Sequence, residues 1–190
     1  FEGKTFKGVL TNKGETIRGD FIIAGIGIKP NIKIAEESGL LVENGILVDE
    51  YCRTNDPNIF AAGDCASFIY QGKRIRLESV GNAIEQSEVA ALATQGGRFN
   101  YKALPWFWSD QFNVKLQIAG LNSGYTDVVE RILGDRSSYW YYKGDKFIAV
   151  DAINDPVSYM VGKKLIEKNQ TPSQKDIAEE SFDLKNLLKG

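Results

Sequence analysis

The chain contains 190 residues, of which 43% are apolar and 25% are charged, and its formal net charge is −2. This composition is typical of a soluble globular protein, and the small net charge argues against binding to nucleic acid or to an anionic membrane. No apolar run approaches the roughly 20 residues that span a bilayer, so we expect a cytoplasmic protein. The sequence contains no histidine, which argues against zinc sites and histidine-based catalytic triads, and we predict no metal site.

The first predicted elements are two strands, a buried strand and a short helix. Residues 4–10 alternate in polarity, and a glycine-containing turn leads from them into residues 16–18, which predicts a hairpin. Residues 20–27 form a continuous apolar run, which is typical of a strand covered on both faces in a parallel sheet. We expect a helix over residues 31–38, capped by its first residue, an asparagine, and ended by Gly39.

A short apolar segment followed by an acidic residue is the main candidate for a ligand site. Residues 59–62 lie between a proline-containing turn and Gly63, which predicts a buried strand, and another strand is expected at 46–49. Gly63 has no side chain, so a ligand can approach the backbone there, and Asp64 can accept hydrogen bonds from ligand hydroxyl groups. Open α/β sheets present ligand-binding groups at the carboxyl ends of buried strands in this way.

The next part of the chain predicts a hairpin and a long helix. Residues 66–70 and 73–76 flank a Gln-Gly turn and are expected to pair as a hairpin. The helix is expected over residues 82–95, with the asparagine at its start as the N-cap and a glutamate three residues later completing a capping box. Its alanines, together with Ile84 and Leu92, supply an apolar face.

The second half of the chain begins with an aromatic stretch. Residues 105–108 read Pro-Trp-Phe-Trp, and three consecutive bulky aromatic side chains are costly to leave exposed to water. In an extended conformation Trp106 and Trp108 share one face. Four strands, one helix and two short tail helices are then predicted, at residues 112–121, 126–133, 137–143 and 146–153, at 155–170, and at 173–181 and 184–188.

Four spaced residues carry a resemblance to a known family. Thr54, Ala61, Gly63 and Asp64 match the pattern T-x6-A-x-G-D, which resembles the second FAD fingerprint of the pyridine-nucleotide-dependent flavoprotein reductases. The resemblance implies that Gly63 and Asp64 bind FAD, with the carboxylate of Asp64 holding a ribityl hydroxyl. It also implies that the flavin pyrimidine edge meets the backbone amide of Val80, at the start of a helix whose dipole stabilises an anion.

The aromatic stretch narrows this resemblance. Residues 105–121 closely resemble the opening of the carboxy-terminal domain of ferredoxin reductases that serve bacterial monooxygenases, ring-hydroxylating dioxygenases and rubredoxin systems. The resemblance implies that Trp108 lies beside the isoalloxazine, where an iron-sulfur partner docks. It also implies that Gly25 and Gly27 line the cleft near the nicotinamide, although Pro30 replaces the third glycine of a G-x-G-x-x-G loop.

By this resemblance the fold class is an α/β partial FAD/NAD(P)-binding domain followed by an α+β carboxy-terminal domain with a small antiparallel sheet. Residues 1–28 are expected to end the NAD(P)-binding domain, 29–98 to form the carboxy-terminal part of the FAD-binding domain, and 99–190 to form the carboxy-terminal reductase domain. The expected function is transfer of electrons from NAD(P)H through FAD to a ferredoxin or rubredoxin-type iron-sulfur protein. Because the first residue is not methionine and the other fingerprints are absent, we expect a fragment that is inactive alone.

Two alternatives stay open. The fingerprint is shared with NADH oxidases and with nitrite-reductase-like and apoptosis-inducing-factor-like flavoproteins, although Cys52 and Cys65 form no C-x-x-C motif for dithiol chemistry. The carboxy-terminal domain could also act only as an interaction or dimerisation module, and the oligomeric state is open. Five cations of this domain could steer an acidic ferredoxin or form ordinary solvated surface, namely Lys115, Arg131, Arg136, Lys163 and Lys164.

Overall fold

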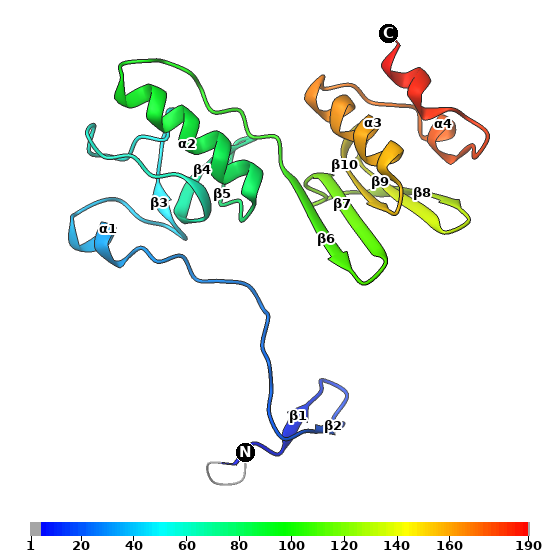
Figure 1. The fold of residues 1–190 in the computed structure, drawn as a ribbon, viewed down its shortest axis with the longest axis horizontal. Coiled ribbons are helices and arrows are strands. Elements are labelled where there is room, and N and C mark those ends of the chain that lie inside the picture. The colour runs from blue at the N-terminus through cyan, green and yellow to red at the C-terminus, as the bar shows by residue number, and fades with distance from the viewer. Residues whose placement is uncertain (1–4, 190) are drawn as a thin grey trace.

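The computed structural model describes residues 5–189, and Figure 1 shows an N-terminal hairpin, an extended segment and two packed units joined by a linker. The hairpin consists of β1 (Gly8–Leu10) and β2 (Thr16–Arg18), which pair in antiparallel fashion. The predicted hairpin is therefore confirmed, with a first strand that is shorter than expected. The predicted start of that strand, at residue 4, lies outside the described residues.

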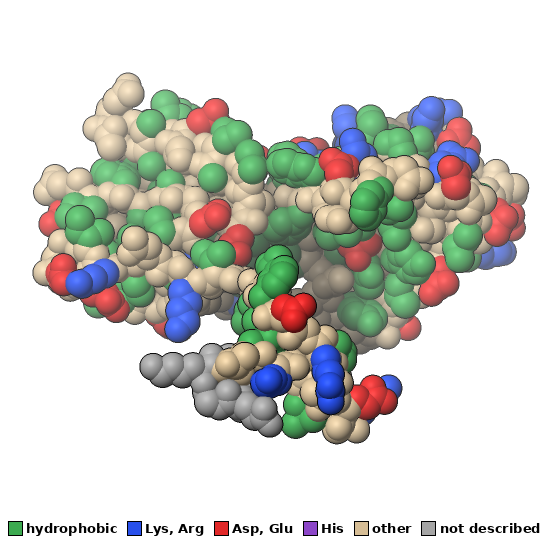
Figure 2. Space-filling view, turned by 60° about the horizontal axis from the view of Figure 1, so that its bottom comes forward, with side chains coloured by type: hydrophobic (Ala, Val, Ile, Leu, Met, Phe, Trp, Pro, Cys, Tyr) green, Lys and Arg blue, Asp and Glu red, His purple; other side chains and the backbone are tan. Residues whose placement is uncertain are grey.

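Residues 20–27 do not form the predicted buried strand. They run as an unpaired extended segment between β2 and the first unit (Figure 1), and Phe21, Ile23 and Ile26 are 76%, 86% and 94% exposed. Apolar side chains accordingly reach the surface in front of the two units in Figure 2. A strand buried on both faces needs neighbouring strands for its backbone and packed layers for its side chains. No described element of this chain supplies either, so the apolar run stays exposed.

The first unit combines a three-stranded sheet with two helices. Its elements are α1 (Lys33–Glu37), β3 (Ile46–Leu47), β4 (Ala66–Tyr70), β5 (Lys73–Ile75) and α2 (Val80–Thr94). The strand order is β3-β4-β5, with β3 parallel to β4 and β4 antiparallel to β5. The predicted β4–β5 hairpin is thus confirmed, and the strand expected at 46–49 is present but shorter. The core of this unit contains Val48, Ala61, Ala66, Phe68 and Leu77.

The two N-terminal helix caps predicted in the first unit are wrong, by one residue in α1 and by three residues in α2. In α1 the cap position is held by Ile32, which makes no side-chain hydrogen bond, and Asn31 lies one residue before it. In α2 the cap is Ser79, whose hydroxyl oxygen accepts a hydrogen bond from the Asn82 amide at 3.2 Å. Asn82 is instead buried inside the helix, where its side-chain nitrogen donates to the carbonyl of Leu77 at 3.0 Å. A buried hydrogen-bond partner here outweighs the preference of asparagine for a cap.

The strand predicted at residues 59–62 is replaced by a tight loop. Only Phe60 forms a β-bridge, and its partner is Arg53, just upstream in the chain. Thr54 closes the loop, because its amide and its hydroxyl both donate to the carbonyl of Ile59, each at 2.9 Å. The segment therefore pairs with the residues that precede it and does not join the sheet. As a result the acidic residue of the fingerprint precedes the strand β4, whereas we expected it to follow a strand.

The second unit is a five-stranded antiparallel sheet with one face covered by a helix. Its elements are β6 (Trp106–Gln111), β7 (Val114–Gly120), β8 (Asp127–Leu133), β9 (Arg136–Lys143), β10 (Lys146–Ile153), α3 (Pro156–Glu167), α4 (Gln174–Ala178) and the 3-10 helix η2 (Leu184–Leu188). The strand order is β6-β7-β10-β9-β8. The core contains Trp140, Tyr142, Phe147, Val150 and Val161.

The predictions for this second unit are largely confirmed. The four expected strands, α3 and both tail helices are present, and the aromatic stretch adds a fifth strand, β6. Asp155 caps α3 as predicted, since its carboxylate accepts a hydrogen bond from the Ser158 amide at 3.2 Å, and Pro156 opens the helix. The architecture is thus an α/β partial domain followed by an α+β domain with a small antiparallel sheet. Within residues 5–189 no helix has the length and apolar character needed to cross a bilayer.

The two cysteines should differ in reactivity. Cys52 is fully buried, and burial, with the charge of Asp49 as a smaller cause, raises the pKa of its thiol to about 11. Because the thiolate is the reactive form, we expect dithionitrobenzoate at pH 8 to modify the half-buried Cys65 and to reach Cys52 only after denaturation. The measurement is the absorbance of the released thiolate with time. Two rapidly reacting thiols in the native chain would contradict this expectation.

Candidate functional site

The candidate site is built around the first two turns of α2. Gly63–Cys65 form a single 3-10 turn, η1, which packs against this helix. The amide of Gly63 donates to the side-chain oxygen of Gln86 at 2.8 Å, and a Cβ at position 63 would lie 3.3 Å from the Cβ of Ala83. Gly63 also has a φ of +78°, a conformation that other residues rarely adopt. The close approach and the backbone conformation therefore both favour glycine.

Asp64 presents its carboxylate at the protein surface. Its backbone carbonyl accepts a hydrogen bond from the guanidinium of Arg76 at 2.9 Å, which fixes the main chain. The guanidinium of Arg76 also forms an ion pair with Glu78 at 2.8 Å. The side chain of Asp64 is exposed and has no hydrogen-bond or ion-pair partner among the described residues. Its carboxylate is therefore free to accept hydrogen bonds from a ligand where η1 meets α2.

A buried polar network holds η1 against α2. Gln86 is fully buried, and its side-chain oxygen accepts hydrogen bonds from the Gly63 amide and from the side chain of Asn82, the latter at 3.2 Å. Asn82 in turn accepts a hydrogen bond from the hydroxyl of Tyr101 at 2.6 Å. Burial raises the pKa of Tyr101, so its hydroxyl remains a donor across the neutral range. The network joins the linker, α2 and η1, so the turn cannot shift independently of the helix.

Sequence reasoning missed this network, although a signal was present. Asn82 and Gln86 stand four residues apart, so they share one face of a helix, and Gly81 is the remaining buried residue of α2. The hydrophobic pattern pointed instead to Ile84 and Leu92, which are 54% and 41% exposed. The amide side chains of Asn82 and Gln86, four residues apart and beside Gly81, thus indicate a buried polar face of the helix. A search for apolar residues alone does not find such a face.

Two stacked tryptophans extend the site from α2 to the second unit. The indole nitrogen of Trp106 lies against Gly81, where any Cβ would collide with it. The rings of Trp106 and Trp108 stack with their centroids 5.4 Å apart and their planes 22° from parallel, which confirms that the two side chains share one face of β6. The amino group of Lys163 lies 4.9 Å from the Trp106 ring centroid. Trp106 is thereby held on several sides, whereas Trp108 remains 48% exposed.

Val80 lies between these two parts of the site. It is the first residue of α2 and is 54% exposed. The first amides of a helix have no acceptor within the helix and carry its positive partial charge. Because the next residue, Gly81, contacts Trp106 and because η1 packs on the following residues, the structure brings η1, Val80 and the tryptophan pair to the same end of α2.

The candidate residues of the two units lie side by side along the surface at one end of α2 and do not line one enclosed pocket. A hollow of about 240 Å³ lies at the tryptophans, and it is lined by Trp106, Phe107, Trp108, Lys115, Gln117 and Tyr159. Asp64 does not line this hollow. Gly25 and Gly27 lie apart from the other candidate residues, in the extended N-terminal segment (Figure 1), and a Cβ at either position would meet no atom within 4 Å. The structure therefore does not bring these two glycines into the site.

The cations expected to steer a partner divide into two kinds. Arg131 is wrong for this role, because it is only 4% exposed and fixes the carboxy-terminal tail to β8. Its guanidinium donates hydrogen bonds to the carbonyls of Ile177, Glu179, Glu180 and Phe182. Lys163 and Lys115, in contrast, lie beside the tryptophans, and the amino group of Lys115 is 4.0 Å from the carboxylate of Asp110.

Comparison with known proteins agrees with this architecture. Residues 2–87 match the family model of the pyridine nucleotide-disulphide oxidoreductases, and residues 106–188 match the family model described as reductase C-terminal. The two matches follow the order of the two packed units in Figure 1. Among the described residues no group of three or more acidic or cysteine side chains is arranged to hold a metal ion. The two matches thus place the chain among the pyridine nucleotide-disulphide oxidoreductases.

Individual relatives narrow this class. The chain is 41% identical over 182 residues to rhodocoxin reductase of Rhodococcus erythropolis, a match that covers 94% of this chain and 43% of that protein. It superimposes on the crystal structure of the ferredoxin reductase for the CYP199A2 system from Rhodopseudomonas palustris with a TM-score of 0.90 and 37% identity, over 98% of this chain and 47% of that one. It also superimposes on the crystal structure of the covalent putidaredoxin reductase–putidaredoxin complex, with a TM-score of 0.85 and 37% identity. That match covers 94% of this chain and 44% of the other chain.

The chain therefore belongs to the pyridine nucleotide-disulphide oxidoreductase family, in its ferredoxin reductase branch. It spans less than half the length of these relatives, between 43% and 47%. The two matched segments, residues 2–87 and 106–188, account for most of the chain and leave residues 88–105 unmatched, which comprise the end of α2 and the linker to β6. The structural alignment continues across that linker, since it covers 98% of the chain.

Replacing Gln86 should destabilise the first unit. Gln86→Leu keeps a side chain of similar size but leaves the Gly63 amide without its acceptor, and an unsatisfied buried donor costs about 1–3 kcal/mol. Urea denaturation should therefore show a lower free energy of unfolding. The matched control is Gln95→Leu, because Gln95 is exposed at the end of the same helix and its replacement should cost less than about 0.5 kcal/mol. Equal stabilities of the two variants would contradict the anchoring role.

Proposed function

We propose that this chain is part of a reductase that moves electrons from NAD(P)H through FAD to a ferredoxin or rubredoxin-type iron-sulfur protein. Membership of the family supports the proposal, and so do its relatives, which include ferredoxin reductases and a reductase–putidaredoxin complex. In this proposal residues 1–28 end the NAD(P)-binding domain, 29–98 belong to the FAD-binding domain and 99–190 form the carboxy-terminal reductase domain. A cytoplasmic location is part of the same proposal.

One arrangement carries the proposal. The unpaired carboxylate of Asp64 lies near the N-terminal end of α2, and the exposed Trp108 lies at the same end of this helix. FAD, when bound, supplies the redox chemistry, since a flavin can accept a hydride and pass electrons on singly. The residues present fit such a cofactor, because the exposed carboxylate of Asp64 can accept hydrogen bonds from ribityl hydroxyl groups. Gly63 is buried against α2, so its part is to set the position of Asp64. The amide of Val80, at the positive end of α2, is suited to the electron-rich pyrimidine edge.

The side chains of this chain bind and orient in this proposal, and none of them acts as an acid or a base. Trp106 is held by Gly81 and Lys163, so the ring stacked on it, that of Trp108, has a defined position at the surface. A rigid, exposed aromatic side chain is typical of the anchors of protein interfaces. The positive charge of Lys163 at the same place would attract an acidic iron-sulfur partner. We therefore assign the docking of the electron acceptor to this face.

The two glycines of the extended segment have a separate part in the proposal. Gly25 and Gly27 are assigned to the nicotinamide side of the cofactor site on the resemblance alone. Gly27 has a φ of +95°, a backbone conformation that glycine adopts without strain. Both positions are exposed and have open space around them, so a ligand or a further layer of protein can approach their backbone closely.

Replacing Asp64 should loosen FAD in the complete reductase. A hydrogen bond to a charged group contributes roughly 1.5–3 kcal/mol, so we expect Asp64→Ala to raise the dissociation constant of FAD by about tenfold or more. Fluorescence titration of the apoenzyme with FAD measures this change. Asp135→Ala removes an exposed carboxylate from the turn between β8 and β9 and serves as the control. An Asp64→Ala enzyme that retains FAD as tightly as the wild type would refute the assignment.

Replacing Trp108 should slow electron delivery to the iron-sulfur partner more than reduction of a small dye. Loss of an interface anchor costs about 2 kcal/mol or more, which corresponds to a fall of about thirtyfold in kcat/KM for the protein acceptor. We expect Trp108→Ala to leave NAD(P)H-dependent ferricyanide reduction near the wild-type rate. Tyr125→Ala, which removes a 50% exposed aromatic ring elsewhere on the second unit, is the matched control. Equal losses in both assays would point to a packing role for Trp108.

A further inference from the structure

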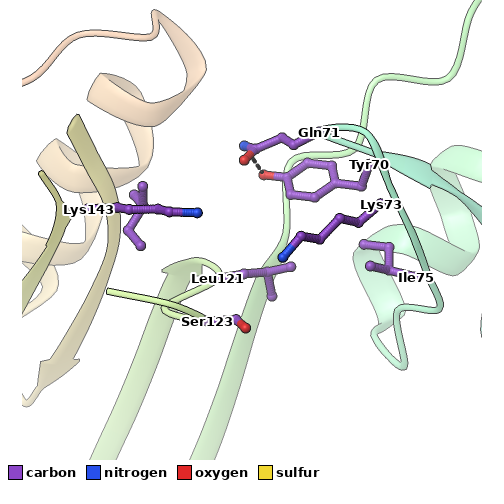
Figure 3. A pocket seen from close by; sticks show the side chains of 8 residues that line it. Tyr70, Gln71, Lys73, Ile75, Leu121, Ser123 and Lys143 are labelled. Carbon is purple, nitrogen blue, oxygen red and sulfur yellow. Dashed lines mark hydrogen bonds between the residues drawn. The ribbon is translucent and has the colours of Figure 1, made fainter. Parts of the chain in front are cut away.

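A second hollow lies where the two units meet, and it shares no residue with the candidate site. It has a volume of about 160 Å³ and is drawn in Figure 3. The β4–β5 hairpin of the first unit forms one wall, and the second unit forms the opposite wall (Figure 3). Leu121 contributes apolar surface to it. Its polar lining consists of Tyr70, Gln71, Lys73, Ser123 and Lys143.

Two lysines face each other across this cleft. The amino groups of Lys73, on β5, and Lys143, at the end of β9, point into the hollow from opposite walls (Figure 3). Neither amino group forms an ion pair with a described residue, and no carboxylate lines the cleft. Two positive charges therefore share one space without a countercharge, and they repel each other. An anion placed between them would be attracted by both.

The other polar groups of the cleft can also donate hydrogen bonds. The side-chain amide of Gln71 donates to the hydroxyl oxygen of Tyr70 at 3.1 Å, which leaves the hydroxyl proton of Tyr70 available. Burial raises the pKa of Tyr70, so this hydroxyl stays protonated across the neutral range. Ser123 adds a second hydroxyl, and lysine ammonium groups are donors only. The lining is thus rich in donors, which favours a ligand that consists mainly of acceptor oxygens.

We propose that this cleft binds a small oxyanion of the phosphate type, which bridges Lys73 of the first unit and Lys143 of the second. Such an ion carries up to two negative charges near neutral pH, which matches the two ammonium groups. The volume of about 160 Å³ equals that of about five waters at about 30 Å³ each. It therefore admits inorganic phosphate or the phosphate group of a small monoester. This binding site is additional to the proposed flavin site and does not depend on it.

Binding of the anion couples the two units. In its absence the repulsion between Lys73 and Lys143 opposes the arrangement in which both line the cleft. With the anion in place each lysine gains a countercharge, so the same arrangement is stabilised. A ligand that binds only the native state raises stability by mass action. Phosphate should therefore raise the thermal midpoint of the chain, and the effect should require both lysines.

Isothermal titration of the 190-residue chain with inorganic phosphate tests this proposal, with sodium chloride used to hold the ionic strength constant because salt screens exposed charges. We expect saturable binding by the wild type. Lys73→Gln and Lys143→Gln should each raise the dissociation constant about fivefold, the change that corresponds to about 1 kcal/mol of exposed ion pairing. Lys146→Gln is the matched control, because Lys146 lies directly opposite Lys143 in the register of β10 and β9 but does not line the cleft.

The possible outcomes separate a built site from general electrostatic attraction. Weakened binding in the two cleft variants together with unchanged binding in Lys146→Gln supports the proposal. Equal weakening in all three variants, or no saturable binding by the wild type, overturns it. Thermal midpoints without phosphate check that the variants fold, and at low salt they should be equal to or above the wild-type value because a repulsion is removed. No step measures flavin or electron transfer, so failure here leaves the proposed function untouched.

Discussion

One hydrogen bond determines the position of Asp64, the acidic residue of the fingerprint. The amide of Gly63 donates it to the side chain of Gln86 at 2.8 Å, and Gln86 is fully buried. Gly63 adopts a φ of +78°, one of several conformations that glycine reaches without strain, and a hydrogen-bond partner holds its peptide in this one. Gln86 supplies that partner from the second turn of α2. Because the main chain is fixed in this way, the carboxylate of Asp64 takes no part in holding the fold and remains available to a ligand.

The small residues at the start of α2 explain how one helix can serve both units. Gly81 admits the indole of Trp106, and Ala83 allows η1 to approach from the other side. A larger side chain at either position would push one of these neighbours away from the helix N-terminus. The buried face of α2 is consequently small and polar, which is unusual for a helix that joins two units. The spacing of the site residues thus depends on the small side chains of Gly81 and Ala83 as well as on the buried polar side chains of α2.

How much of the fold could be predicted depends on where each element finds its partners. β9 and β10 are neighbours joined by a short turn, and α3 carries its own cap and proline, so local patterns predicted them closely. Residues 20–27 and 59–62 were predicted as buried strands because apolar runs usually seek burial. Burial requires neighbours, however, and the first run has none among the described residues, whereas the second pairs with the loop just before it. Apolar content alone could not reveal either outcome.

The same distinction applies to the candidate site residues. Asp64 and Trp108 carry recognisable local patterns, so sequence could nominate them, and the spacing of Gln86 from Asn82 was a further signal. The proposed roles of Lys73 and Lys143 arise only from what these residues face. The two lysines add a charge interaction across the cleft to the apolar packing between the units, in which Trp106 lies against Gly81 and both Phe107 and Leu121 pack on the core of the first unit. Packing at the tryptophans is short-ranged and insensitive to ionic conditions, whereas the charges across the cleft are screened by salt and neutralised by anions. The packing at the tryptophans is therefore a fixed contact between the units, whereas the charges across the cleft respond to the ionic surroundings.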